Sequence, residues 1–189
     1  MKSVWIEKTK QKGQPERLNG PRSVGRAIWS PVTATDGKNI YSNMLLVKQG
    51  DIVIHLIDDA RISAISIVKG SHITECKGLP GTDWDEKTDC YLWSLHSSTN
   101  LPHVYDRKNF LNKAFTPLLL KITETTEVFY TKKLSLRQGA YLTPCSKELL
   151  TFLNREYKIL SGRTLPHISN EIVYKDTISL EETIDNNFS

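Results

Sequence analysis

The chain has 189 residues, of which 39% are hydrophobic and 24% charged, and its formal net charge is +4. This length fits one domain, or one domain with an appendage, and is sufficient to bury a hydrophobic core. No apolar run approaches the length of a membrane span, and the three cysteines, which are not closely spaced, fit neither a disulfide framework nor a zinc site. We therefore expect a cytoplasmic protein with reduced thiols and no membrane partner.

The charge is unevenly distributed along the chain. Residues 1–26 contain seven Lys or Arg against two Glu, whereas residues 171–189 contain five Asp or Glu against one Lys. A basic N-terminal segment suits a polyanionic partner, because phosphate contacts dominate non-specific nucleic-acid binding; a solvated, lysine-rich loop is the alternative. We expect residues 1–170 to form the domain and residues 171–189 to form an acidic linker or tail.

The first half of the chain predicts strands separated by one long loop and one short helix. Residues 3–9 alternate between apolar and polar side chains and predict a strand. Residues 10–26 are polar and contain several Gly and Pro, which predicts a long loop. Residues 39–47 carry apolar side chains at helical spacing. Residues 51–57 and 61–69 predict a hairpin of buried strands.

The second half predicts one further strand, residues 91–96, and one amphipathic helix. Thr143 is expected to cap the start of this helix, with Pro144 at its first position, and Gly162 is expected to end it. Its buried stripe is predicted to contain Leu149, Phe152, Leu153, Tyr157 and Leu160. The pattern is α+β: a curved, mostly antiparallel sheet or small β-barrel flanked by helices.

The polar residues give no sign of catalysis. The five histidines are scattered, and His55 lies in the apolar run I-V-I-H-L, where a hydrogen-bonded core histidine is expected. The glycines match neither the phosphate-binding loop nor the dinucleotide fingerprint, and the acidic residues around Trp84 have no histidine at metal spacing. We expect a binding domain without enzyme activity, cofactor or metal.

The four tryptophans divide according to their sequence context. Trp5 and Trp93 lie within strand-like runs and are expected in the core. Trp29 precedes Ser-Pro, which forces an extended exit from its strand, and Trp84 follows a Pro-Gly turn. An aromatic face that stacks on an extruded base contributes about 1–3 kcal/mol. We predict that Trp29 and Trp84 form an aromatic slot for a nucleobase.

Several motifs follow one another in a specific order within residues 3–165. They are S-V-W-I-E-K-T, G-R-A-I-W-S-P, I-Y-S-N-M, V-K-Q-G-D-I-V-I-H-L, I-S-A-I-S-I-V and G-L-P-G-T-D-W. This order resembles the EVE/YTH branch of the PUA-like superfamily. It looks most similar to the versions that precede AAA+ motor domains in McrB-type, modification-dependent restriction systems, which residues 137–144 (R-Q-G-A-Y-L-T-P) also resemble.

The resemblance implies a barrel-like sheet that reads a modified base extruded into an aromatic cage. Trp29 and Trp84 would form opposite walls of this cage, with Leu79 as a third wall. Asn19 and Ser30 would contact the base edge. The chain departs from the YTH pattern in having a single tryptophan in the second loop. The flanking phosphates would be held by Lys8, Lys10, Lys12, Arg17, Arg22 and Arg26.

The first functional hypothesis is therefore a DNA-binding module that recognises a modified base by flipping it and targets a McrB-type restriction complex. By analogy with the YTH cage, N6-methyladenine is the favoured base, followed by 5-methylcytosine or 5-hydroxymethylcytosine. A fused AAA+ motor and a separate nuclease subunit would be its partners. A reader of modified RNA and a protein-interaction domain without nucleic-acid binding are the alternatives, and the net charge does not separate them.

Overall fold

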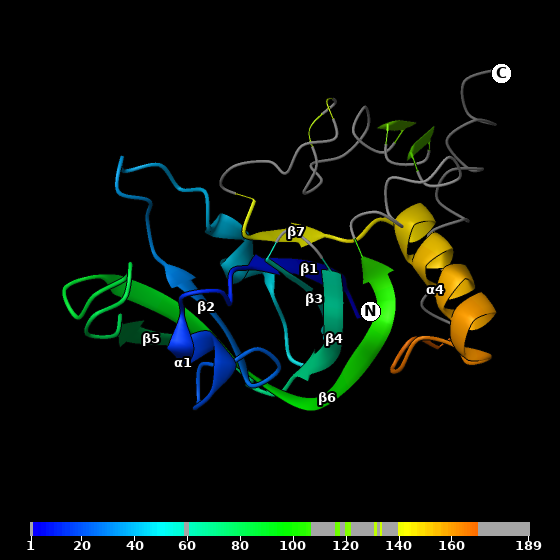
Figure 1. Ribbon diagram of the computed structural model, residues 1–189. Helices are drawn as coiled ribbons and strands as arrows, with labels where there is room; N and C mark the ends of the chain where they lie inside the picture. Colours follow the sequence, from blue (N-terminus) through cyan, green and yellow to red (C-terminus); the bar gives the residue numbers. More distant parts are fainter. Residues whose placement is uncertain are drawn as a thin grey trace, which may run out of the picture.

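The computed structural model describes residues 2–58, 61–106, 116–117, 120–121, 131, 133 and 140–169, except the side chains of 102–106. Within these residues, one strongly curled mixed sheet carries a helix against one face (Figure 1). The α+β architecture with a curved, mostly antiparallel sheet is confirmed. The predicted acidic tail, residues 171–189, lies outside the described residues.

The strands follow the order β2-β6-β4-β3-β1-β7, and β5 pairs with β6 beside this path. Their bounds are β1 Val4–Thr9, β2 Ala27–Pro31, β3 Ile52–Ile57, β4 Arg61–Val68, β5 Thr74–Lys77, β6 Asp89–Asp106 and β7 Leu142–Pro144. β1 runs parallel to β3, and the other pairs are antiparallel. The long strand β6 curls so that it pairs with β2 and β5 near its start and with β4 farther along.

The predicted hairpin is β3 and β4. Every residue of β3 is buried, as its nearly continuous apolar sequence predicts for a strand covered on both faces. The predicted strand at 91–96 is part of the much longer β6. The helix predicted at 39–47 is a 3₁₀ helix, η1, over Ser42–Leu46.

The amphipathic helix is α4, Lys147–Ser161, and its start differs from the prediction. Ser146 is the N-cap, and its hydroxyl accepts a hydrogen bond from the Leu149 amide, while Thr143 and Pro144 belong to strand β7. Thr143 and Ser146 both carry a hydroxyl that can cap a helix. Because Thr143 is paired with Ile6 of β1 as part of strand β7, the helix begins later and Ser146 caps it. Gly162 ends the helix in the left-handed region with φ of 71°, as predicted.

The two faces of the sheet have separate hydrophobic clusters. One cluster joins β1, β3 and β4 to α4 through Leu149, Leu150, Leu153 and Tyr157. Leu160, predicted in the buried stripe, is instead 61% exposed. The other cluster fills the inside of the curl and contains Trp5 and Trp93, both buried as predicted. No helix among the described residues is long and apolar enough to cross a membrane.

Candidate nucleic-acid interface

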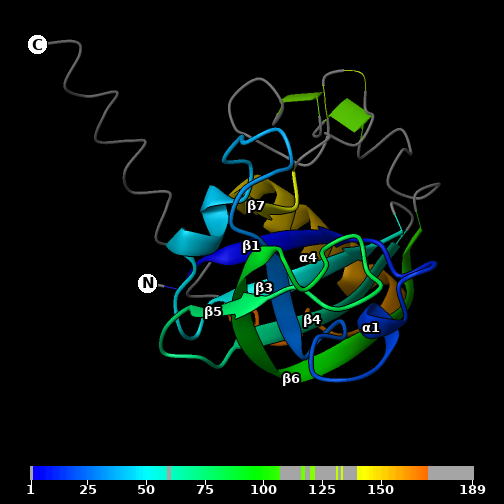
Figure 2. The ribbon, with the colours of Figure 1, turned by 90° about the vertical axis from the view of Figure 1, so that its left-hand side faces the viewer.

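Four aromatic side chains meet on the side of the sheet opposite α4, where Figure 2 shows α1 (Pro15–Leu18) and the β5–β6 loop facing the viewer. Trp29 and Trp84 pack edge to face, with ring centroids 4.9 Å apart and planes at 86°. Trp84 lies 6.2 Å from both Tyr41 and Tyr141, and these two tyrosines are 6.1 Å apart. All these ring pairs are steeply inclined, so none of them forms two parallel walls.

This geometry corrects the predicted slot between Trp29 and Trp84. A base stacked between two rings needs walls about 7 Å apart and parallel, because each contact takes about 3.5 Å. Trp29 and Trp84 touch each other instead, and Trp29 is only 1% exposed. It lies in the middle of β2, paired with Leu92 of β6.

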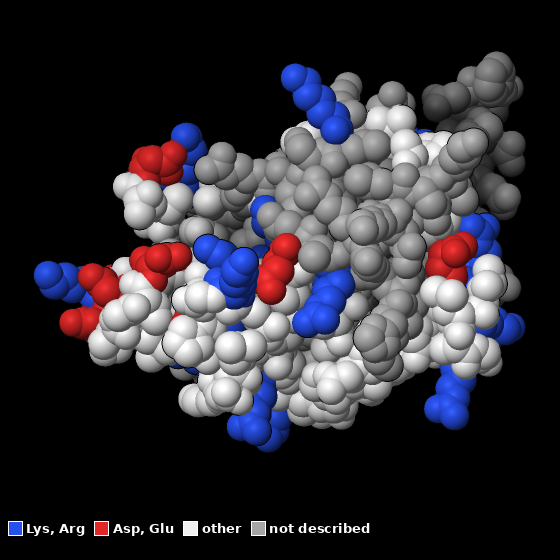
Figure 3. All heavy atoms as spheres, viewed as in Figure 1, with Lys and Arg blue, Asp and Glu red and all other residues white. Residues whose placement is uncertain are grey.

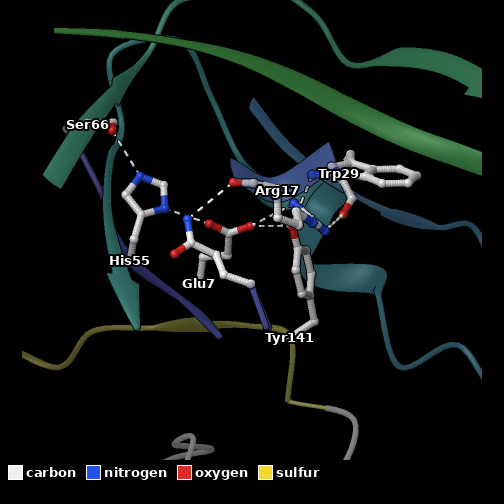
Figure 4. Close-up of polar contacts among 7 residues, drawn as sticks. Glu7, Arg17, Trp29, His55, Ser66 and Tyr141 are labelled. Atoms are coloured by element: carbon white, nitrogen blue, oxygen red, sulfur yellow. Dashed lines mark hydrogen bonds and ion pairs between the residues drawn. The ribbon is translucent and has the colours of Figure 1, made fainter. Parts of the chain in front are cut away.

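Arg17 lies at the centre of the aromatic cluster. Its guanidinium carbon is 4.9 Å from the Trp29 ring centroid, 5.5 Å from that of Trp84 and 5.9 Å from that of Tyr141. The side chain is 1% exposed, pairs with Glu7 at 3.4 Å and donates to the Trp29 carbonyl at 3.1 Å (Figure 4). Within the part of the chain that the structure describes, its Nε–H has no hydrogen-bond partner. A buried donor without a partner is costly, so this group is suited to an incoming acceptor.

Glu7 connects Arg17 to a buried polar network inside the curl. Its carboxylate accepts from the Tyr141 hydroxyl at 2.6 Å and contacts His55 Nδ1 at 2.5 Å, and His55 Nε2 contacts the Ser66 hydroxyl at 2.9 Å (Figure 4). Because an ionised carboxylate only accepts hydrogen bonds, His55 Nδ1 carries a proton. Glu7, His55 and Ser66 are each 0% exposed. His55 is thus the hydrogen-bonded core histidine that the sequence predicts.

The network shifts two pKa values in opposite directions. Burial alone would raise the pKa of Glu7, but its contacts with His55, the charge of Arg17 and the hydrogen bond from Tyr141 outweigh burial and hold this pKa below the ordinary 4.5. Burial and the neighbouring Glu7 charge raise the pKa of the Tyr141 hydroxyl well above 10.0. Glu7 therefore stays ionised and Tyr141 stays neutral at physiological pH.

A pocket of about 180 Å³ opens beside this cluster. Since one water takes about 30 Å³ of liquid, the pocket has room for about six waters, which suits one small ring system. Its polar lining consists mostly of hydrogen-bond donors. The lining residues are Lys8, Thr9, Lys10, Gln14, Arg17, Tyr41, Trp84 and Tyr141.

A larger groove, about 1050 Å³, lies on the other side of Tyr41 and Trp84. The loop after β2 and the end of the β5–β6 loop form its walls. Its lining includes Asp36, Asp83 and Asp89 as well as Lys38 and Lys87. This mixed charge is less suited to a phosphate backbone than the lysines of the smaller pocket.

Of the residues predicted to contact a base, only Trp84 lines the small pocket. Asn19 is exposed at the end of α1. Ser30, whose backbone was expected to contact the base, is fully buried in β2 opposite Tyr91 of β6. Leu79 is half-buried, and its amide donates to the Trp84 carbonyl, so it shapes the loop rather than the pocket.

The six basic residues predicted to hold phosphates differ in how accessible they are to a phosphate. Lys8 and Lys10 line the pocket, and Lys12 and Arg26 are exposed. Arg17 is buried, contrary to the expectation of a surface contact. Arg22 lies over the Trp29 ring at 4.5 Å and donates to the Lys77 carbonyl at 2.7 Å, so part of its donor capacity is already used. On the face seen in Figure 3, Lys and Arg are interspersed with Asp and Glu rather than gathered in one patch.

The sequence did not single out Tyr41, Tyr141 or Glu7 as site residues. One signal for Glu7 was present: it directly follows the apolar run Val4–Ile6 of β1, while His55 lies inside that of β3, and a buried charge needs a partner. The two are direct partners in the parallel pair of β1 and β3. Among the described residues, no three His, Cys, Asp or Glu side chains come together to form a metal site.

Comparisons with known proteins give structural similarity without sequence similarity. No protein-family description matches the chain, and no curated protein matches it. Among solved structures, the N-terminal domain of Staphylothermus marinus McrB has a TM-score of 0.43 at 10% identity, covering 76% of this chain and 88% of that domain.

Two further solved structures are also similar. A Pseudomonas putida protein has a TM-score of 0.48 at 9% identity, covering 82% of this chain and 99% of its own. A hypothetical protein from Leishmania major has a TM-score of 0.48 at 8% identity, with 85% and 97% covered.

Proposed function

We propose that this chain is a DNA-binding module that holds one base, turned out of the duplex, in the pocket lined by Tyr41, Trp84 and Tyr141. The observation that carries the proposal is that three aromatic side chains and Arg17, whose buried Nε–H has no partner among the described residues, surround one pocket of about 180 Å³. An aromatic face binds any base by stacking, and a buried donor pairs with an acceptor on the base edge.

The charge around the pocket supports a nucleic acid over an uncharged ligand. Lys8 and Lys10 line the pocket, and Lys10 is exposed, so a phosphate next to the extruded base can reach a cation. These lysines fix the register of the strand without reading its sequence.

A modified base is the preferred guest. A methyl group buried against aromatic rings contributes about 0.8 kcal/mol, which adds to stacking and helps to offset the few kcal/mol needed for flipping. We propose that this preference targets a McrB-type restriction complex, as the motif resemblance implies. The favoured modified base is N6-methyladenine, followed by 5-methylcytosine or 5-hydroxymethylcytosine.

The test is fluorescence anisotropy with one duplex in four versions: unmodified, N6-methyladenine, 5-methylcytosine and 5-hydroxymethylcytosine. A matched RNA competitor is included to test RNA reading. Preference for one DNA version is the expected result. Equal, salt-sensitive binding of all four versions would contradict base recognition, and stronger binding of RNA would move the proposal to RNA.

Trp84→Ala tests the aromatic wall directly. Loss of one stacking contact, about 1–3 kcal/mol, predicts a 5- to 150-fold weaker affinity for the preferred duplex. Trp84→Phe keeps an aromatic face and is the matched control, expected to retain most of the affinity. Circular dichroism checks that both variants are folded. Undiminished preference in a folded Trp84→Ala variant would remove Trp84 from the site.

A further inference from the structure

Two of the three cysteines lie directly opposite each other across a strand pair. Cys76 of β5 and Cys90 of β6 are direct partners in the antiparallel register, although fourteen positions apart in the chain. Two residues beyond this pair on each strand, the Gly78 amide donates to the carbonyl of Thr88, which lies opposite it. Because hydrogen-bonded pairs recur at every second residue of an antiparallel ladder, Cys76 and Cys90 also form a hydrogen-bonded pair. Such pairs have Cα atoms about 5.5 Å apart, within the range of disulfides, and their side chains share one face. Their Cβ atoms are also about 5.5 Å apart, beyond the roughly 3.5–4.5 Å of a disulfide, so the strands must shift slightly for the bond to form, and the resulting strain makes the bond easy to reduce.

The surroundings of this pair allow a reagent to reach one thiol first. Cys76 is half-buried and Cys90 is buried, so an oxidant meets Cys76 before Cys90. Cys145, the third cysteine, lies between β7 and α4, packed against the hydrophobic cluster of that helix. It is therefore well separated from the pair and serves as an internal control.

We propose that Cys76 and Cys90 form a reversible disulfide that locks the β5–β6 loop, residues 78–88. The oxidant is a low-molecular-weight disulfide such as oxidised glutathione. The Cys76 thiolate attacks one glutathione sulfur, forms a mixed disulfide and releases one glutathione thiolate. Cys90 then loses its proton and attacks the Cys76 sulfur, which forms the intramolecular bond and releases the second glutathione thiolate. Two protein thiols are oxidised and one disulfide is reduced.

The loop closed by this bond carries a wall of the pocket. Trp84 is held within it because the Leu79 amide donates to the Trp84 carbonyl at 2.7 Å and the Thr82 hydroxyl donates to the same carbonyl, also at 2.7 Å. The loop also packs closely on its own start: a Cβ on Gly78 would lie 2.0 Å from the Trp84 carbonyl oxygen. A covalent link across the loop's ends limits how far Trp84 can move. The consequence for base binding rests on the proposed function, whereas the disulfide and the locked loop do not.

The charges around the pair make its oxidation slow at neutral pH. Burial raises the pKa of Cys76, and burial together with the Cys76 charge raises that of Cys90 to about 11. The positive charge of Arg22 lowers the pKa of both cysteines, and that of Arg17 lowers the pKa of Cys90. The negative charge of Asp89 raises the pKa of Cys90, and the Tyr41 hydroxyl is also close enough to interact with Cys90. Because only thiolates react, we expect the rate to rise about tenfold for each pH unit between pH 7 and 9.

Peptide mapping tests the bond. The whole chain is treated with oxidised glutathione, denatured in the presence of excess alkylating reagent so that buried free thiols also react, and digested with trypsin without reduction. Cleavage after Lys69, Lys77, Lys87 and Arg107 is expected to give peptide 70–77 linked to peptide 88–107, with peptide 78–87 released unmodified. The linkage should persist in Cys145→Ala and disappear in Cys76→Ser. Cys76 found only as a glutathione adduct, or both thiols found alkylated, overturns the proposal.

Limited proteolysis of the folded protein tests the locked loop without any nucleic acid. Trypsin should release peptide 78–87 several-fold more slowly from the oxidised protein than from the reduced protein, and dithiothreitol should restore the rate. Cys76→Ser should show no dependence on oxidation. Equal release rates from fully cross-linked and reduced protein overturn the locking. Since no oligonucleotide is present, failure of duplex binding is a separate result that counts against the proposed function alone.

Discussion

Glu7 organises the floor of the candidate site because it holds three side chains at once. Arg17, Tyr141 and His55 each contact its carboxylate, and the first two of them line the pocket. The positions of Arg17 and Tyr141 at the pocket therefore depend on a carboxylate that is itself fully buried and does not line it. Glu7 is a positioning residue for whatever the pocket binds.

Glu7→Gln is expected to destabilise the fold strongly. The substitution leaves the buried Arg17 guanidinium without its counter-charge, and breaking a buried ion pair in this way typically costs about 3–5 kcal/mol. Urea unfolding at pH 7 measures the loss. Asp36→Asn removes the carboxylate of an exposed pair with Lys38 and should leave the unfolding curve unchanged. Equal effects of the two substitutions would show that the Glu7 pair adds nothing beyond a surface pair.

The lowered pKa of Glu7 predicts how stability depends on pH. A carboxyl whose folded-state pKa lies below its unfolded value stabilises the fold above the unfolded pKa, and this contribution is lost as pH falls through the folded pKa. For Glu7 the contribution is complete above about pH 4.5 and declines below it. The free energy of unfolding, measured from pH 7 down to pH 3, should fall less steeply in Glu7→Gln than in the wild type. Parallel slopes would contradict the lowered pKa.

At the level of elements, the start of α4 offers a paired test of capping. Ser146→Ala removes the hydroxyl that accepts from Leu149 and should cost about 0.5–2 kcal/mol. Thr143→Val alters the residue that the sequence indicates as the cap, yet its buried hydroxyl has no partner in strand β7, so this change should be neutral or stabilising. Thermal unfolding compares the two. A larger loss in Thr143→Val would place the cap where the sequence pattern put it.

The elements were predictable from the sequence where local pattern and burial agree. The hairpin of β3 and β4, the strand β1 and the C-terminal stop of α4 at Gly162 follow from apolar runs, alternation and turn chemistry. The segment 10–26 predicts a loop because it is polar and contains three Gly and two Pro. Its short helix α1 nevertheless turns Arg17 inward, where Glu7 pairs with it. The sequence around Arg17 does not predict this partner, because Glu7 belongs to a different element, strand β1.

At the scale of the whole molecule, the pocket is assembled from four separate stretches of the chain. The curl of the sheet brings the β1–α1 segment, Tyr41, Trp84 and Tyr141 together, although up to about 130 positions separate them. The parallel pairing of β1 with β3 and the path of β6 produce this convergence, and neither follows from periodicity. The sequence therefore indicates Trp84 and the lysines as site residues but does not indicate which tyrosines face them.

The arrangement of charges also predicts how salt affects DNA binding. Each phosphate neutralised contributes about −0.9 to the slope of log Kobs against log salt. Six surface cations would give about −5.4, but Arg17 is buried, Arg22 is engaged with Trp29 and Lys77, and Lys8 is half-buried with a contact of its own. The three exposed cations, Lys10, Lys12 and Arg26, predict a slope of about −2.7. Anisotropy titrations between about 50 and 200 mM salt measure this slope.

Lys10→Ala should make this slope shallower by about 0.9 and weaken all four duplexes alike, because a phosphate contact carries no base information. Lys158→Ala is the matched control: this exposed lysine lies on α4, which Figures 1 and 2 place on the side of the sheet away from the β5–β6 loop, and the slope should not change. A slope near zero in the wild type would exclude a phosphate-driven interface. A slope near −5.4 would require Arg17 and Arg22 to leave their present partners when DNA binds, so that binding would break the Glu7 pair that shapes the pocket.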